Sequence, residues 1–311
     1  MSKYGRWMIV FGFGLMCLGA AFAAFNYKVL FKPFYDSSKY VTQEYYVEKY
    51  DIAKLVVDTS LDNIRIISTN SDEVKITYFE NDEFYYEISQ IDSVYTIKGV
   101  RNYKFSLFNF NTFDPRITIE IPEDLILDYN IITSNSPISL VGVNAGDIYF
   151  KTSNDDIEIL NSNVTNNITL ITSNDGITLK NMTANRISAK TSNGDIDVKN
   201  VEVNTIDLKT SNDEINLESV VARNKIVCKT SNGDIDFSEL ESPVIDLTTS
   251  NSSVKGTISA LETEYAKDLK TSNGQIFIGK ASYGKKLVDN ENSNNKLLIK
   301  TSNANIKLNF R

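Results

Sequence analysis

Residues 187–205 read ISAKTSNGDIDVKNVEVNT, and this 19-residue stretch contains the pattern that decides the fold. Apolar residues alternate with polar ones on both sides of its central motif, Thr191-Ser192-Asn193. The alternating apolar residues are Ile187, Ala189, Ile196 and Val198. Alternation at period two is typical of a strand with one buried face. The stretch therefore predicts two short strands joined by a turn at the Thr-Ser-Asn motif.

The Thr-Ser-Asn motif recurs nine times at a nearly constant period. Its copies begin at Thr133, Thr152, Thr172, Thr191, Thr210, Thr230, Thr249, Thr271 and Thr301. The spacings are 19 or 20 residues as far as Thr249, and the last two are 22 and 30. A fixed period near 20 residues indicates a repeat architecture. The apolar columns recur with the motif, and a second turn near Asn161, Asn181 and Asn200 closes each unit.

Two architectures place two strands in 20 residues: a β-solenoid and a meander of hairpins. Asn193-Gly194 could form a hairpin turn. Only the solenoid explains why every turn has the same tripeptide, because parallel coils stack in register about 4.8 Å apart. We therefore expect an all-β solenoid with 19–20 residues per coil. We expect the motif asparagines to adopt the left-handed conformation of a sharp arc, which asparagine tolerates. Because each side-chain amide can bond the asparagines above and below it, we also expect them to form a hydrogen-bonded ladder. Its members are Asn135, Asn154, Asn174, Asn193, Asn212, Asn232, Asn251, Asn273 and Asn303.

An uncharged apolar segment covers residues 7–25, directly after Lys3 and Arg6. A helix of that length would be about 28 Å long, close to the hydrocarbon thickness of a bilayer. Its basic flank predicts a single-pass bacterial membrane anchor with a cytoplasmic N-terminus and the rest of the chain outside. We assign residues 1–27 to this anchor or signal segment and 28–50 to a juxtamembrane linker. The alternative is cleavage before Ala24, which would release the protein.

Residues 51–311 form one predicted solenoid domain, starting near Ile52, with two interruptions. The first, residues 77–116, contains eleven Phe or Tyr residues and is read as inserted strands. These strands either cap the solenoid or form a recognition surface, for which Tyr85, Tyr86 and Tyr103 are the candidates. The second, residues 274–296, precedes the last coil. We expect it to fold over that coil, residues 297–310, and to prevent end-to-end stacking.

The composition excludes several functional classes. The chain has no histidine, so neither a Ser-His-Asp triad nor an imidazole-ligated metal can form. Two cysteines cannot make a disulfide framework, and Cys228 lies in an apolar column where a small buried residue is expected. A net charge of -8 without a basic tract argues against nucleic-acid binding.

One acidic column follows the motif, and one basic column precedes it. The acids are Asp156, Asp195, Glu214 and Asp234, and the bases are Lys151, Lys190, Lys209, Lys229, Lys270 and Lys300. The acids could bind calcium, but we favour a solvated stripe balanced by the lysines. Asp195 and Glu214 would also suit a glycosidase, yet coils of constant length leave no loops to wall a cleft. We therefore expect no metal, no cofactor and no catalytic residue.

Residues 117–121 form a strand ending in Ile121-Pro122, followed by repeated Thr-Ser-Asn-Gly-Asp-Ile units behind a single N-terminal span. Over roughly residues 50–311 the chain resembles the bacterial "putative adhesin" family, whose members carry serial Ser/Thr-x-Gly-Asp-Ile coils. The glycine of that pattern is present only at Gly194, Gly233 and Gly274. The resemblance implies a β-helical, non-catalytic, envelope-exposed domain, and some relatives are linked to envelope stress responses.

These observations predict a non-enzymatic, membrane-anchored envelope protein that acts by binding or scaffolding. The expected partners are the lipid bilayer, through residues 7–25, and a cell-wall glycan or another envelope protein. Two alternatives remain open: a β-helical enzyme acting on polysaccharides, and a structural protein that polymerises end to end.

Overall fold

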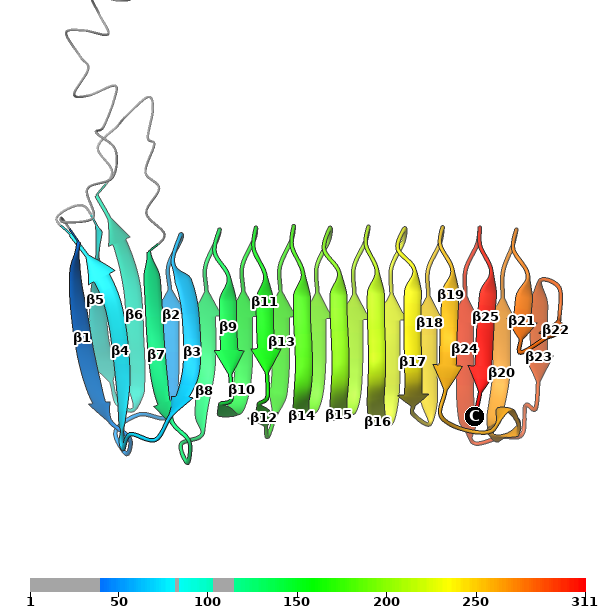
Figure 1. Cartoon of the computed structure of the whole chain (residues 1–311), viewed down its shortest axis with the longest axis horizontal. Coiled ribbons are helices and arrows are strands. Elements are labelled where there is room, and N and C mark those ends of the chain that lie inside the picture. Colours follow the sequence, from blue (N-terminus) through cyan, green and yellow to red (C-terminus); the bar gives the residue numbers. More distant parts are fainter. Residues whose placement is uncertain (1–39, 82–83, 103–114) are drawn as a thin grey trace, which may run out of the picture.

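The computed structural model describes residues 40–81, 84–102 and 115–311, which form an elongated β-solenoid (Figure 1). Strands of successive coils pair in parallel and in register; Ile177 lies opposite Ile196, for example, and Lys190 opposite Lys209. This pairing confirms the solenoid and excludes the meander of hairpins. Within the described residues no helix is long and apolar enough to cross a membrane. The predicted anchor at residues 7–25 lies outside them.

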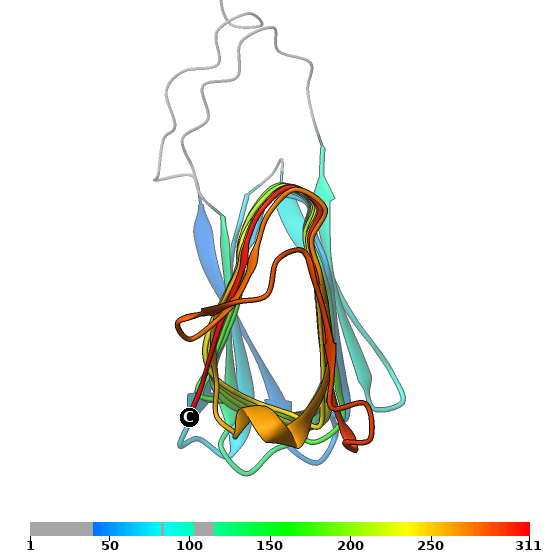
Figure 2. The same cartoon turned by 90° about the vertical axis from the view of Figure 1, so that its right-hand side faces the viewer.

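Each coil has two long sides and a short third side (Figure 2). Strands on one long side lead into a motif or, for β2, into the Thr59-Ser60-Leu61 turn: β2 (Lys54–Asp58), β8 (Leu127–Ile132), β10 (Asn144–Lys151), β13 (Asn167–Ile171), β18 (Val244–Thr248), β20 (Tyr265–Lys270) and β24 (Asn295–Lys300). Strands on the other long side follow these turns: β3 (Asn63–Thr69), β9 (Ile138–Val141), β11 (Ile157–Leu160), β17 (Ile235–Glu241), β19 (Val254–Ile258), β21 (Ile276–Ile278) and β25 (Ile306–Phe310). The third side holds β12 (Asn163–Val164). In the most regular coils β14 (Ile177–Lys190), β15 (Ile196–Lys209) and β16 (Ile215–Lys229) run from one motif to the next.

The left-handed backbone conformation occurs at the second corner of the coil, where the chain enters the short side. Asn161, Asn181 and Asn200 have φ of 51°, 54° and 53°, and Ser219 and Glu239 take the same position in later coils. The motif asparagines are not among the residues with positive φ. The expectation of left-handed asparagines at the motif was therefore wrong. The sharp bend that needs this conformation is the second turn, whereas the motif arc is held by bonds to the neighbouring coil.

The core consists of stacked aliphatic columns that the strand alternation turns inward. Ile157, Ile177, Ile196, Ile215 and Ile235 form one such column, and none of them is more than 1% exposed. Cys228 is completely buried in register with Leu208 and Leu247, which confirms the prediction of a small core residue. Because each of these isoleucines pairs in register with the isoleucine of the next coil, the side-chain packing repeats from coil to coil along the solenoid axis.

The N-terminal end is widened by antiparallel strands. These are β1 (Val41–Glu48), β4 (Glu73–Glu80) and β5 (Phe84–Ile91), next to the end coil of β6 (Val94–Arg101) and β7 (Arg116–Pro122). On one long side β4 pairs with β7 and β1 with β4; on the other β5 pairs with β6. The coil β2–β3 lies between β6–β7 and β8–β9, because its strands pair with both. The aromatic insertion thus forms end strands.

The C-terminal end has its coils in a different order from the sequence. The last coil, β24–β25, lies between β18–β19 and β20–β21 and pairs with both (Figure 1). The coil β20–β21 is therefore outermost. Two short strands, β22 (Ala281–Ser282) and β23 (Lys286–Asp289), pair antiparallel with β21 and β20, so their connection crosses the end of the solenoid (Figure 2).

The insertion at residues 274–296 consequently covers the Thr271 coil rather than the final coil. The prediction that it folds over residues 297–310 was wrong. The physical reason is that β23 already occupies the outer edge of β20, so the last strands fill the gap on its inner side.

Candidate functional site

The nine motif asparagines form one continuous ladder of eight side-chain hydrogen bonds. In each, the Nδ2 amide of one asparagine donates to the Oδ1 oxygen of its neighbour over 2.5–2.8 Å. The order in space is Asn135, Asn154, Asn174, Asn193, Asn212, Asn232, Asn251, Asn303 and Asn273. The side-chain amides of neighbouring coils thus bond each other from the Thr133 coil to the Thr271 coil.

The motif threonines are buried, and the hydroxyls of all except Thr133 donate to a backbone carbonyl of the neighbouring coil. Thr210 Oγ1 donates to the carbonyl oxygen of Gly194 over 3.0 Å, and Thr249 Oγ1 bonds that of Gly233 in the same way. The residue after the asparagine is crowded where it is glycine, since a Cβ at Gly233 would lie 1.7 Å from the Asp213 carbonyl oxygen. The motif residues therefore hold the coils together and offer no chemistry of their own.

The aspartates of the acidic column accept hydrogen bonds from the backbone of the neighbouring coil. One carboxylate oxygen of Asp156, Asp195 and Asp234 accepts the backbone N–H of Gly176, Glu214 and Ser253, over 2.8–3.1 Å. Burial and neighbouring aspartates raise the pKa of Asp156 and Asp195. For Asp234 burial acts in the same sense, but the Ser253 bonds and Lys255 outweigh it and lower the pKa.

Two lysines of the basic column pair with aspartates of their own strands rather than with the acidic column. Lys209 and Lys270 pair with Asp207 and Asp268 on their own strands, at 3.1 and 2.9 Å. Within the described residues, no cluster of three or more acidic or cysteine side chains is arranged to hold a metal ion. The three aspartates of the acidic column instead accept hydrogen bonds from backbone amides of the next coil.

The three predicted recognition tyrosines do not form one surface. Tyr86 is 7% exposed, and its hydroxyl donates to the buried Asp62 Oδ1 over 2.6 Å. Its ring packs edge-on against Phe84 and Tyr78 at 4.9 and 5.0 Å. Proposing Tyr86 as a surface residue was therefore wrong, because strand alternation turns it into the core. Tyr85 is half-buried on the outer face of β5, and Tyr103 lies outside the described residues.

Asp62 is the one carboxylate in this end of the described core that lies fully out of contact with solvent. Its Oδ1 is 3.5 Å from Arg101 Nη2, and its Oδ2 has no hydrogen-bond partner. Burial raises the pKa of Asp62. The Arg101 guanidinium lies over the Phe84 ring at 4.2 Å, so this buried cluster joins a carboxylate, a cation and aromatic rings.

A shallow groove of about 580 Å³ crosses the outer face of β14, β15, β16, β17 and β19. Its polar lining is Lys180, Asp197, Lys199, Asn216, Glu218, Asp236, Ser238 and Lys255. Lys199 pairs with Glu218 at 2.8 Å and Lys255 with Asp236 at 2.9 Å. Sequence analysis missed this groove because its residues occupy ordinary outward-facing strand positions. The only signal was the succession of opposite charges in register in neighbouring coils.

The fold defines a class: a parallel β-solenoid extended at both ends by antiparallel strands. Residues 52–309 match the family model described as Toastrack DUF4097, and the chain belongs to this family. The family resemblance predicted from the coils is thereby confirmed. No curated protein sequence matches the chain.

Several solved structures are similar to this chain over most of its length. A "putative adhesin" from Bacteroides fragilis has 15% identity and a TM-score of 0.40, covering 88% of this chain and 98% of that one. A "putative adhesin" from Parabacteroides merdae has 14% identity and a TM-score of 0.39, with coverages of 89% and 99%. A "putative lipid binding protein" from Parabacteroides distasonis has 12% identity and a TM-score of 0.38, with the same coverages.

Proposed function

We propose that this chain is a non-enzymatic, membrane-anchored envelope protein whose solenoid binds a neutral glycan chain along the groove face. The observation that carries the proposal is the groove itself, in which Lys199 and Lys255 are already paired with carboxylates. Asn216 Nδ2 likewise donates to Asp197 Oδ1 over 3.1 Å. Paired charges leave little net charge to select an ion, but they present donors and acceptors side by side. Sugar hydroxyls can bond to both.

The shape of the groove favours a polymer. Its lining comes from successive coils, so it extends along the solenoid axis rather than into a closed cavity. The acidic column supports a non-catalytic role, because its carboxylates accept backbone hydrogen bonds and a glycosidase needs two carboxyl groups free to act on the substrate.

The anchor and the location belong to the same proposal. An apolar segment of bilayer length at residues 7–25, after Lys3 and Arg6, supports a membrane-bound chain with its solenoid outside. The family resemblance extends the proposal to the envelope stress response. Protease added to intact cells should remove the solenoid from a membrane-bound chain; a full-length chain recovered in the cytosol would contradict this topology.

Binding is tested with the full chain in detergent and purified cell-wall glycan in a pull-down. Ser238→Tyr places a ring in the groove at an exposed position, and we expect at least a tenfold loss of binding. Ser188→Tyr makes the same change on the opposite long side and should bind like the unmodified chain. Equal binding by both variants would remove the groove from the proposal. Release of shortened glycan would overturn the non-enzymatic assignment.

A further inference from the structure

A row of lysines runs along the long side whose strands lead into the motif, away from the groove. Each residue of the row lies directly opposite the next on the neighbouring strand. In spatial order its seven positions are Lys190, Lys209, Lys229, Thr248, Lys300, Lys270 and Lys286. Because adjacent strands are about 4.8 Å apart, this lysine row is about 29 Å long. All its lysines are exposed except Lys270, which is half-buried.

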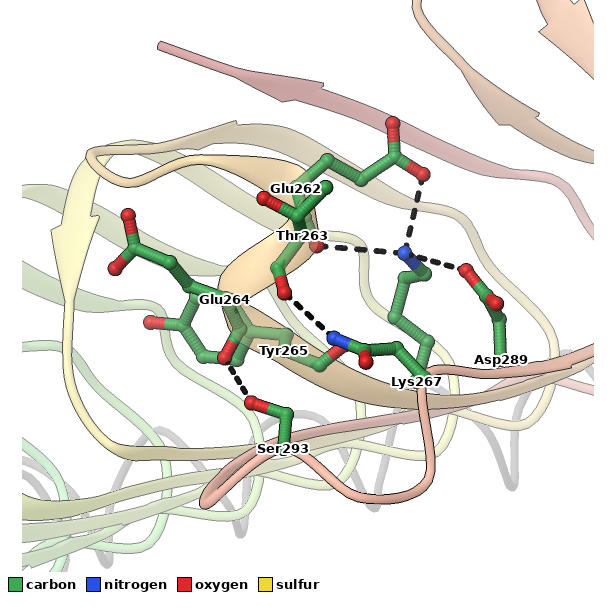
Figure 3. Close-up of polar contacts among 8 residues, drawn as sticks. Glu262, Thr263, Glu264, Tyr265, Lys267, Asp289 and Ser293 are labelled. Carbon is green, nitrogen blue, oxygen red and sulfur yellow. Dashed lines mark hydrogen bonds and ion pairs between the residues drawn. The ribbon is translucent and has the colours of Figure 1, made fainter.

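The insertion before the last coil extends the lysine row by one strand. Strand β23 pairs antiparallel with β20 and places Lys286 directly opposite Lys270. It is fastened there by Lys267 of β20, whose ammonium lies between Asp289 of β23 at 2.9 Å and Glu262 at 3.2 Å (Figure 3). The ion pair on the inward face therefore keeps a further lysine in line on the outward face.

Most of the charge in the row is uncompensated. Among the described residues, two of the six lysines have an ion-pair partner: Lys209 lies 3.1 Å from Asp207, and Lys270 lies 2.9 Å from Asp268. The other four have none, and they are Lys190, Lys229, Lys286 and Lys300. Like charges directly opposite each other on neighbouring strands are destabilising. A row that keeps such charge, in a chain with a net charge of -8, suits a negatively charged partner.

The row is one residue wide, and this width distinguishes a chain from a surface as the partner. The outward column two residues before it contains Asp207, Asp246 and Asp268. On its other side the backbone turns into the motif arc. A bilayer lying on the row would also cover these carboxylates, whereas a single extended chain covers the lysines alone. A small anion would reach only neighbouring lysines of a row about 29 Å long.

We propose that the lysine row binds a linear polyanion whose charged groups are phosphates and which lies along the solenoid axis. The row contains no arginine, the residue suited to bidentate recognition of carboxylates, whereas lysine binds phosphate as a point charge on a flexible stem. Neither the row nor the column beside it contains an aromatic residue from β14 to β23, so nucleobases find no stacking partner. One solenoid can then hold a neutral glycan on one long side and a polyanion on the other.

Binding of long-chain inorganic polyphosphate to the full chain in mild detergent tests the row. The triple variant Lys190→Gln, Lys229→Gln and Lys300→Gln removes three unpaired charges. We expect at least a tenfold loss of affinity and a slope of log Kd against log salt that is lower by about 2, because each lost contact releases fewer counterions. The melting temperature should not fall, since repulsion between neighbouring lysines is relieved. Unchanged affinity in this variant overturns the proposal.

A matched variant separates the row from the charge of the whole chain. Arg65→Gln, Arg116→Gln and Lys307→Gln together remove three exposed cations from the other long side. This variant should lose less than threefold in affinity, and a loss equal to that of the first triple variant would overturn the row. Ser238→Tyr, in the groove, should bind polyphosphate like the unmodified chain, so that the two sites are tested separately.

Competition identifies the kind of polyanion. Tripolyphosphate at the same total phosphate concentration should compete poorly, because it is too short to follow the row. Anionic phospholipid added to the detergent micelles should not compete, and polyglutamate should bind more weakly than polyphosphate. Equal competition by tripolyphosphate or by the phospholipid would overturn the extended chain as the partner, and equal binding of polyglutamate would overturn phosphate as its charged group.

Discussion

Asn303 donates its side-chain amide to Asn251 Oδ1 over 2.6 Å, although 52 residues separate the two in the sequence. Asn273, which follows Asn251 in the sequence, lies one coil farther out and donates to Asn303 over 2.7 Å. The last coil therefore completes the stack from within. Residues 295–310 occupy the space of one coil between β18–β19 and β20–β21.

The order of the coils can be checked by cross-linking. Asp246 of β18 lies opposite Leu298 of β24, and Asp268 of β20 lies opposite Leu298 on the other side. We predict that Asp246→Cys with Leu298→Cys forms a disulfide rapidly, because adjacent strands are about 4.8 Å apart. Asp246→Cys with Asp268→Cys should not, since two strand spacings exceed the reach of a disulfide. Cys228→Ala serves as background. A disulfide between positions 246 and 268, without one between 246 and 298, would show that the coils are stacked in the order of the sequence.

Two buried threonines offer a matched measurement of the motif's hydrogen bond. Thr210 Oγ1 bonds the Gly194 carbonyl, whereas Thr133 Oγ1 has no hydrogen-bond partner. We predict that Thr210→Val lowers the free energy of unfolding by about 1–3 kcal/mol, because a buried carbonyl loses its donor. Thr133→Val should be neutral or slightly stabilising. Both are read from urea denaturation, and an equal loss in both would show that the hydroxyl contributes nothing specific.

The sequence was sufficient for the architecture because each coil repeats one local rule. Alternation predicts which side chains face inward, as for Ile187 and Ile196, and identical turns predict parallel stacking in register. The spatial order of the coils could not be predicted, since the motif at Thr301 is the same whether it follows Thr249 or Thr271. The charged groove was missed for a related reason: its pairs, such as Lys199 with Glu218, form between coils and depend on rotamers rather than on spacing.

Lys267 shows how one buried charge secures the C-terminal end. It is 3% exposed and occupies the inward column of Leu297, so an apolar residue would suit its site. We predict that Lys267→Met stays within about 1 kcal/mol of the unmodified chain, because Asp289 and Glu262 can be solvated. Asp289→Ala should lower stability by about 1–3 kcal/mol, since it leaves a buried ammonium with fewer acceptors. Greater damage from Lys267→Met than from Asp289→Ala would refute this account.

The same contact predicts the response of this end to pH. Burial would lower the pKa of Lys267, but its bonds to Asp289 and Glu262 outweigh burial and raise it. The bond to Lys267 lowers the pKa of Asp289. The contribution of Asp289 is therefore present above its ordinary pKa and lost as the pH falls through the lowered value. That of Lys267 is lost only as the pH rises through its raised value. The hydrogen-exchange protection of residues 281–290, measured relative to the intrinsic exchange rate at each pH, should fall at both extremes and remain constant between about pH 5 and pH 9.

Replacing an asparagine of the ladder by alanine should lower the free energy of unfolding in proportion to the number of ladder bonds that the residue makes. Asn193 donates to Asn174 Oδ1 over 2.8 Å and accepts from Asn212 over 2.7 Å, so Asn193→Ala removes two rungs. Asn135, at the end of the ladder, accepts from Asn154 alone among the motif asparagines, so Asn135→Ala removes one. Because these side chains are exposed and water can replace each bond, we predict losses near the low end of the usual range. The expected decreases in unfolding free energy are about 1–2 kcal/mol for Asn193→Ala and about half as much for Asn135→Ala. Urea midpoints at constant m-value measure both, and equal losses would mean that the backbone of each arc, rather than the ladder, determines the stability of the edge.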